Sequence, residues 1–167
     1  VYWLAGVLTI QGDPNAPTNR PGEVDADYVN RGLSGYFNDG LPLTKPPYAH
    51  LVAIDLNKGE QLWMTPNGDG PRDHPLLKPL NLPPLGNPGR SSPLVTKTLV
   101  IMGDPQATTT PRGRGAMLRA YDKATGAEVG AIFIPAPQSG SPMTYSIDGR
   151  QYIVVAVSGG AYSGEYI

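Results

Sequence analysis

The chain has 167 residues, enough for one domain with a modest core, and its 21 Gly and 19 Pro against 16% charged residues argue against a helical fold. Its net charge of -1, from 13 basic and 14 acidic residues, excludes the electrostatic signature of a nucleic-acid-binding protein. The absence of cysteine excludes disulfides, Cys-ligated zinc and thiol nucleophiles.

The first 47 residues contain one strand signal, followed by a long irregular stretch. Val1–Ile10 is apolar but lacks a basic leader region and the length needed to span a bilayer, so it is interpreted as a strand. Gln11–Pro47 is rich in Pro, Gly, Asn and Asp and sustains no helical or strand period. We therefore expect residues 1–47 to be irregular apart from the opening strand.

Residues 48–167 carry a series of short strand signals. They are separated by turn residues, and by a second stretch rich in Gly and Pro at Thr65–Pro93. No amphipathic helical pattern exceeds two turns, so we predict an all-β fold of two or three antiparallel, blade-like sheets. The expected strands are Ala49–Leu56, Glu60–Met64, Ser92–Val95, Thr98–Gly103, Met117–Asp122, Ala127–Ile134, Met143–Ile147 and Gln151–Val157.

The last two of these strands are predicted to form a β-hairpin. Asp148-Gly149 lies between them, and an Asp-Gly pair suits a tight type I′ turn, whose two central residues need positive φ. The second arm, from Tyr152 to Val157, is apolar on both faces. It is therefore expected to lie inside a stack of sheets with no solvated side.

Two segments repeat each other with the skeleton Ala-x-Asp-x-x-x-Gly. The first runs from Ala53 to Trp63, and the second from Ala120 to Gly130. In each copy a strand is predicted to end at the Asp, which can bond the amides of the turn, and the chain turns on the Gly. Each copy is followed by another strand, as expected for repeated sheet units.

The first copy resembles the tryptophan-docking motif, Ala-x-Asp-x-x-Thr-Gly-x-x-x-Trp, of the quinoprotein dehydrogenases. These enzymes hold pyrroloquinoline quinone (PQQ), usually with Ca²⁺, at the axis of an eight-bladed β-propeller. Lys58 replaces the motif's Thr in the first copy, and Gly130 replaces the Trp in the second. The resemblance implies that Trp63 packs between blades, and that Trp63→Ala costs roughly 3–5 kcal/mol.

A second string strengthens the resemblance. Ser141-Pro142-Met143-Thr144-Tyr145, then Gln151 to Ala156 and Gly159-Gly160, are similar to a string near the carboxy terminus of the family's alcohol and sugar dehydrogenases. The likeness is good from Pro46 to Ile167 and poor before it. By this likeness residues 48–167 are carboxy-terminal propeller blades of a longer chain, and the catalytic residues belong to upstream blades.

The best local candidate for a cofactor contact is the segment from Asn87 to Pro93. It matches the position of a family segment whose backbone approaches the quinone, and it supplies the candidate residues Gly89, Arg90 and Ser91. A planar guanidinium can bind a PQQ carboxylate through two bonds, which suits Arg90. A solvent-exposed arginine in a flexible loop is the alternative interpretation.

Other conspicuous residues are given structural roles. Asp55 and Asp122 are expected to cap turn amides, and His50 and His74 lack the spacing of a metal site. The segment therefore contains no expected catalytic or metal-binding residue of its own.

Two functional hypotheses follow. The resemblance implies a PQQ-dependent dehydrogenase that oxidises a sugar, polyol or alcohol and passes electrons to a quinone or cytochrome, with PQQ and Ca²⁺ mostly bound outside this segment. It also implies a periplasmic location, with any membrane attachment supplied by sequence outside this segment. The alternative is a non-catalytic propeller scaffold with similar repeats. The isolated segment is expected to be inactive and to self-associate through open sheet edges.

Overall fold

The computed structural model describes residues 7–10, 28–31, 40–110 and 112–157. The chain divides into two compact units, Val1–Thr44 and Lys45–Ile167. In the first unit, strand β1 (Val7–Ile10) pairs with β2 (Tyr28–Arg31) in an antiparallel two-stranded sheet. Strand β1 lies inside the predicted opening strand, and β2 falls within the stretch that was expected to be irregular.

The second unit is built from antiparallel strands and contains, among its described residues, one short 3₁₀ helix, η1 (Lys78–Leu80). The all-β prediction is confirmed. Eight of the strands match predicted ones, and β7, which lies between two predicted strands, is the additional strand. The strands are β3 (His50–Asp55), β4 (Glu60–Pro66), β5 (Leu94–Val95), β6 (Leu99–Gly103), β7 (Thr108–Thr110), β8 (Gly113–Asp122), β9 (Glu128–Ile134), β10 (Met143–Ile147) and β11 (Arg150–Val154).

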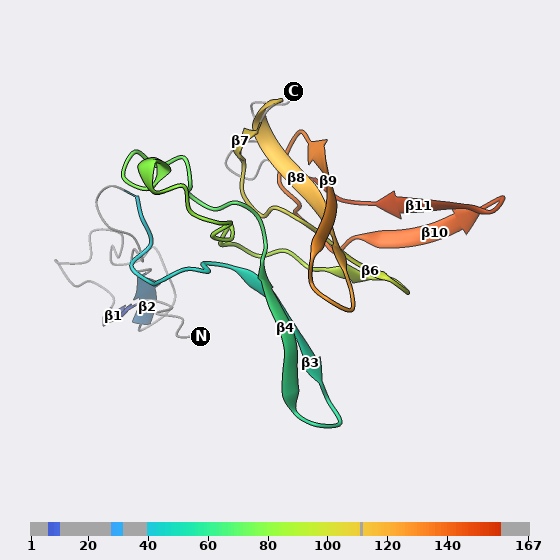
Figure 1. Ribbon diagram of the computed structural model, residues 1–167. Helices are drawn as coiled ribbons and strands as arrows, with labels where there is room; N and C mark the ends of the chain where they lie inside the picture. The colour runs from blue at the N-terminus through green and yellow to red at the C-terminus, as the bar shows by residue number, and fades with distance from the viewer. Residues whose placement is uncertain (1–6, 11–27, 32–39, 111, 158–167) are drawn as a thin grey trace. The chain divides into compact units, whose positions relative to one another are not determined.

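These strands form three sheets in the second unit. Strands β3 and β4 make one hairpin and β10 and β11 another, while β5, β6, β8, β7 and β9 form a five-stranded sheet centred on β8. Figure 1 shows the two hairpins as separate ribbons beside the larger sheet. The blade-like, antiparallel character predicted from the sequence is therefore present.

Both copies of the repeated skeleton form the same turn. In the first, Asp55 Oδ1 accepts hydrogen bonds from the amides of Asn57 (2.9 Å) and Lys58 (3.3 Å). In the second, Asp122 Oδ1 accepts from the Thr125 amide and from the Thr125 hydroxyl, both at 2.9 Å. The aspartates therefore hold turns, as expected of short side chains that bond nearby amides.

Trp63 packs against the second repeat, which confirms the predicted docking between sheets. Its Nε1 donates to the carbonyl oxygen of Lys123 at 3.0 Å. A Cβ atom placed on Gly126 would lie 2.6 Å from Trp63 Cε3, so the ring rests on the bare backbone of that glycine. Gly126 also has a φ of 74°, a conformation that favours glycine.

The hairpin predicted at Met143–Val157 is confirmed, but the burial predicted for its second arm is wrong. Asp148 and Gly149 have φ values of 49° and 76°, as a type I′ turn requires. All five residues of β11 are exposed. An apolar run is buried on both faces only when sheets cover both faces, and β11 belongs to a sheet of two strands.

The interior of the second unit is partly apolar and partly polar. Tyr121 and Ala116 are fully buried within the five-stranded sheet. Beside them lies a set of buried polar and charged side chains, which positions the candidate site. These are Asn67, Asn87, Asp104, Arg119 and Gln138.

Candidate functional site

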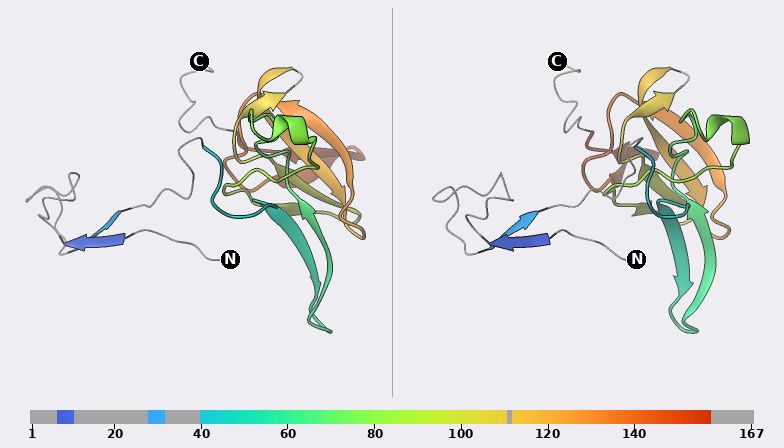
Figure 2. Two further views of the ribbon diagram at one scale, coloured as in Figure 1. Left: turned by 60° about the vertical axis from the view of Figure 1, so that its left-hand side comes forward. Right: turned by 90° about the vertical axis from the view of Figure 1, so that its left-hand side faces the viewer.

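Several loops meet at one end of the five-stranded sheet. Because β6 and β9 both run antiparallel to β8, their ends lie toward the amino-terminal half of β8: Gly103 pairs with Leu118, and Ile134 pairs with Ala116. The start of β5 lies at this same end, because Leu94 pairs with Ile101. The loops before β5, after β6 and after β9 therefore lie together. Figure 2 shows, from two further sides, the β3–β4 hairpin extending away from the five-stranded sheet.

The long stretch between β4 and β5 folds back on itself to reach this position. Asn87 N donates to Asn67 O (2.7 Å), and Leu85 N donates to Asp69 O (3.0 Å). These backbone hydrogen bonds close the loop that contains η1. As a result, the segment that follows Asn87 returns to the end of the sheet.

A small polar pocket of about 260 Å³ lies there, which we call the serine pocket. It brings together two segments that lie about fifty residues apart along the chain. Arg90 is exposed, whereas the hydroxyl oxygen of Ser91 is buried and has no hydrogen-bond partner among the described residues. A buried hydroxyl without a partner is costly and indicates a missing acceptor or donor. The lining residues are Arg90, Ser91, Ser92, Ser139, Gly140 and Ser141.

Gln138 connects the two walls of the serine pocket. Its side-chain Nε2 donates to the carbonyl oxygens of Ser92 and Gly140, both at 2.8 Å. Its Oε1 accepts from the Gly103 amide at 2.6 Å, which fixes both walls to the end of β6. Gln138 is 2% exposed, so these bonds are shielded from water.

Gly89 lies just before the pocket in the sequence, and its lack of a side chain lets this segment pack closely against Pro105. A Cβ atom at this position would lie 2.5 Å from Pro105 Cβ, in the loop after β6. Any larger residue would displace the segment that carries Arg90 and Ser91.

An ion network is centred on the buried pair Arg119 and Asp104, and it extends to Asp69 and Glu128, which are partly exposed. The Arg119 guanidinium donates to Asp104 Oδ1, Glu128 Oε2 and Asp69 Oδ2 at 3.0, 3.0 and 2.9 Å. Burial alone would lower the pKa of Arg119, but hydrogen bonding and charge from Asp104, followed by Glu128, outweigh it and raise that pKa above its ordinary value. Arg119 therefore stays charged at any physiological pH.

Two buried asparagines lie beside this network. Asn67 Oδ1 accepts from the Tyr121 hydroxyl at 3.0 Å, and Asn87 Oδ1 accepts from the Gly70 amide at 2.9 Å. Burial raises the pKa of the Tyr121 hydroxyl, which therefore remains a donor. The Nδ2 atoms of Asn67 and Asn87 have no hydrogen-bond partner among the described residues.

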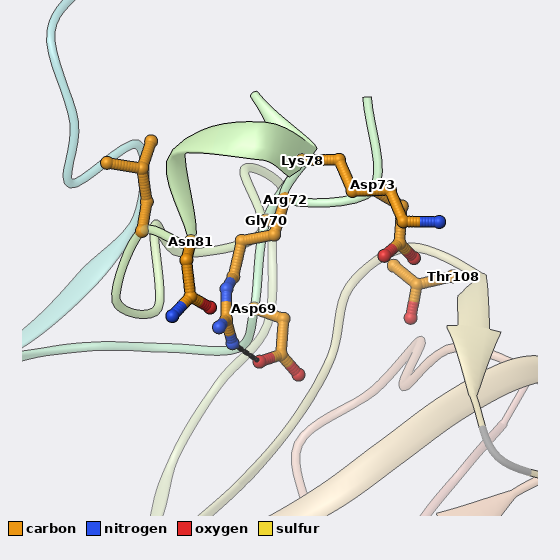
Figure 3. A pocket seen from close by; sticks show the side chains of 8 residues that line it. Asp69, Gly70, Arg72, Asp73, Lys78, Asn81 and Thr108 are labelled. Carbon is orange, nitrogen blue, oxygen red and sulfur yellow. Dashed lines mark hydrogen bonds and ion pairs between the residues drawn. The ribbon is translucent and has the colours of Figure 1, made fainter. Parts of the chain in front are cut away.

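A second, larger pocket of about 320 Å³ lies nearby, which we call the charged pocket. In Figure 3 the Arg72 guanidinium reaches Asp69, at an N–O distance of 3.0 Å, while Lys78 and Asp73 lie on the Thr108 side. Asp69 also binds Arg119, so this pocket is joined to the ion network. Its lining residues are Asp69, Gly70, Arg72, Asp73, Lys78, Asn81, Leu82 and Thr108.

The structure brings Arg90 and Ser91 together in the serine pocket, with Gly89 directly before them. Sequence reasoning missed Gln138, Arg119 and the residues of the charged pocket. One signal for Arg119 was available, because it is a charged residue between Leu118 and Ala120 in the apolar part of strand β8. Gln138 carries no such signal, since its role depends on the convergence of three loops.

Neither a metal cluster nor a membrane helix is present in the described part of the chain. No group of three or more His, Asp or Glu side chains there is arranged to hold a metal ion. Within the same residues, no helix is long and apolar enough to cross a membrane.

Comparison with known proteins identifies what this arrangement is similar to. The PQQ family profile described as "Glucose/ethanol/alcohol dehydrogenase, beta-propeller domain" matches residues 13–153. This match begins well before Pro46, so the likeness extends further toward the amino terminus than the motifs indicated.

Individual relatives point the same way. A protein named "Probable quinate dehydrogenase (quinone)" from Xanthomonas campestris pv. juglandis is 34% identical over 97% of this chain and 19% of its own length. The glycerol dehydrogenase large subunit of Gluconobacter oxydans is 31% identical over 72% of this chain and 16% of its own length. The quinoprotein glucose dehydrogenase of Escherichia coli is 30% identical over 77% and 16%. The chain therefore spans less than a fifth of the length of these relatives.

Proposed function

Because this chain belongs to the PQQ family of the glucose/ethanol/alcohol dehydrogenase β-propeller domain, we propose that it is the carboxy-terminal part of a longer PQQ-dependent dehydrogenase. The whole protein would oxidise a sugar, polyol or alcohol. The named relatives act on quinate, glycerol and glucose, which supports this substrate class. The catalytic residues would lie on other parts of the longer protein.

The family match carries the proposal, and the serine pocket is the place in this chain that best suits the cofactor. PQQ bears carboxylate groups, and the pocket offers the donors that carboxylates need: the Arg90 guanidinium and the buried, unpartnered Ser91 hydroxyl. The residues present therefore fit one edge of such a cofactor. When bound, PQQ supplies the two-electron acceptor for oxidation of the substrate alcohol.

The roles of this chain's own residues follow from their contacts. Arg90 would pair with a carboxylate at the pocket mouth, and Ser91 would donate a hydrogen bond from within. Gln138 would hold the two pocket walls at a fixed separation, because it bonds both walls and β6. Gly89 would keep the segment close to Pro105. The chain thus orients the cofactor and supplies no expected proton-transfer group.

The charged pocket supports a hydroxylated substrate. Asp73 can accept hydrogen bonds from hydroxyl groups, while Lys78, Arg72 and Asn81 can donate to their oxygens. It opens at the same end of the sheet as the serine pocket.

Three further parts of the proposal rest on the family. A Ca²⁺ ion would accompany PQQ and be held by residues outside this chain. The electron acceptor would be a quinone or a cytochrome, two partners that appear in the names of relatives. The location would be periplasmic.

Reconstitution of the full-length protein tests the proposal. The apoprotein is incubated with PQQ and Ca²⁺, and dye reduction is followed with glucose, glycerol, quinate and ethanol. We expect dye reduction that requires both PQQ and at least one of these substrates. A folded full-length protein that binds no PQQ would contradict the proposal and favour the non-catalytic scaffold.

A further inference from the structure

Gly130 occupies the position in the second repeat that Trp63 occupies in the first. Trp63 on β4 pairs with Ala53, and the β3–β4 register shifts directly after that pair. Gly130 on β9 pairs with Ala120, and the β8–β9 register shifts at the same point. The two positions are therefore equivalent in backbone geometry as well as in sequence.

In the first repeat this position is filled by an aromatic side chain. The Trp63 ring rests on Gly126 and its Nε1 donates to Lys123 O, so an indole covers the adjacent sheet. At Gly130 that side chain is missing. A Cβ atom placed on Gly130 would meet no atom within 4 Å, so the space beside this backbone position is empty.

The open space is a groove of about 370 Å³, which we call the Gly130 groove. Ile101, Ala120 and Gly130 form a row across β6, β8 and β9, because Ala120 pairs with both of the others. Ile153 of β11 lines the groove opposite this row. The groove is thus bounded by two sheets, which favours a flat occupant.

The charge pattern of the groove favours a neutral occupant. Arg119 is the charged residue among those that line it, and each of its three guanidinium nitrogens already bonds a carboxylate. The charge of Arg119 is therefore already paired, so the described residues that line the groove offer no free cation to an anion. The remaining lining residues are apolar or glycine, and burying apolar area is the favourable term available.

We propose that the Gly130 groove is a binding site for a neutral planar aromatic molecule of about the size of indole. The equivalent position of the first repeat shows that an indole fits this backbone against a neighbouring sheet. A ring held between Ala120 and Ile153 would remove apolar area from water on both of its faces. This site is separate from the proposed cofactor site and does not depend on it.

The test is an amide NMR titration of the 167-residue chain with indole. We expect saturable shifts at Ala120, Gly130, Ile132 and Ile153. Gly130→Trp should fill the groove and raise the dissociation constant for indole about tenfold or more, which corresponds to roughly 1.4 kcal/mol. The control Val129→Trp adds the same ring at the neighbouring exposed position, outside the groove lining, and should leave binding unchanged.

A second variant and a second probe sharpen the result. Ile153→Asp places a charge on the opposite wall and should weaken indole binding even if Gly130→Trp fails to fold by circular dichroism. Benzoate, an anion, should bind more weakly than indole. The proposal would be overturned by any of three results. These are shifts that fail to saturate with indole, shifts that depend on protein concentration and not on indole concentration, and shifts that persist unchanged in both groove variants.

Discussion

The two aspartate turns differ at the residue before the glycine, which is Lys58 in the first and Thr125 in the second, and this difference changes their hydrogen bonds. Thr125 donates both its amide and its hydroxyl to Asp122, whereas the equivalent Lys58 gives Asp55 its amide. The Thr125 hydroxyl, followed by the turn amides, lowers the pKa of Asp122 below its usual value near 3.8. A folded-state pKa that is depressed stabilises the fold above the unfolded-state pKa.

We therefore predict that Thr125→Ala raises the pKa of Asp122 toward 3.8. The stabilisation from this carboxylate should be present above about pH 4 and be lost as the pH falls through the folded-state pKa. Carboxyl NMR titration measures the change. Thr125→Ser keeps the hydroxyl and should keep the pKa low, so an equal rise in both variants would contradict this origin.

Trp63 is the residue whose role followed most directly from its motif. The indole is half-buried, so Trp63→Ala should cost about 2–3 kcal/mol, at or below the lower end of the range for a fully buried aromatic. Trp63→Phe keeps most of the ring but loses the hydrogen bond to Lys123, and should lower the free energy of unfolding by about 1 kcal/mol relative to wild type. Urea unfolding provides both values. A cost for Trp63→Ala no greater than for Trp63→Phe would show that ring packing contributes nothing.

At the scale of elements, the loops at the end of the five-stranded sheet are held by few bonds. Gln138 joins Gly103, Ser92 and Gly140, and no other described side chain bonds both walls of the serine pocket. Removing its amide would leave the buried Gly103 amide without its partner. An unsatisfied buried donor costs more than the bond itself contributes.

Gln138→Leu should therefore lower the free energy of unfolding by roughly 2–4 kcal/mol. Gln151→Leu is a matched control, because Gln151 donates to Thr144 on the exposed face of the β10–β11 hairpin. That change should stay within about 0.5 kcal/mol. Equal effects of the two variants in urea unfolding would contradict the cross-linking role of Gln138.

Local patterns predicted the elements well and predicted burial less well. The turn chemistry of Asp148-Gly149 and the two Asp-to-Gly turns is encoded within a few residues, so both were found. The exposure of Tyr152 to Val154 was missed, because burial of a strand depends on which sheets lie beside it. Of the two segments that line the serine pocket, one was predicted from the sequence. Arg90 and Ser91 belong to one recognisable segment, but Gln138 and Ser139 reach it only through the fold.

At the scale of the molecule, much apolar surface of the second unit is uncovered. Both two-stranded hairpins expose large hydrophobic side chains, and their strands are edges within the described part of the chain. Such surfaces seek partners. The exposed set includes Val52, Ile54, Leu62 and Met64 on β3–β4, and Ile147, Ile153 and Val154 on β10–β11.

The isolated 167-residue chain should therefore self-associate, and it should bind PQQ weakly at best. The proposed cofactor contacts lie along one edge of PQQ, and loops without neighbouring sheets would have to be ordered by the ligand. Light scattering should show an apparent mass that rises with concentration, and Leu62→Lys should reduce the rise. A strict monomer that binds PQQ with submicromolar affinity would show that this chain is a complete cofactor module.

The central claim is that the serine pocket holds PQQ in the whole protein, and its most direct test is PQQ affinity measured by calorimetry on the full-length protein. Wild type is compared with Arg90→Ala and with Arg112→Ala, which removes an exposed arginine that does not line the serine pocket. We predict that Arg90→Ala weakens PQQ binding about tenfold or more, while Arg112→Ala leaves it unchanged. Equal PQQ affinity in all three proteins would contradict the claim.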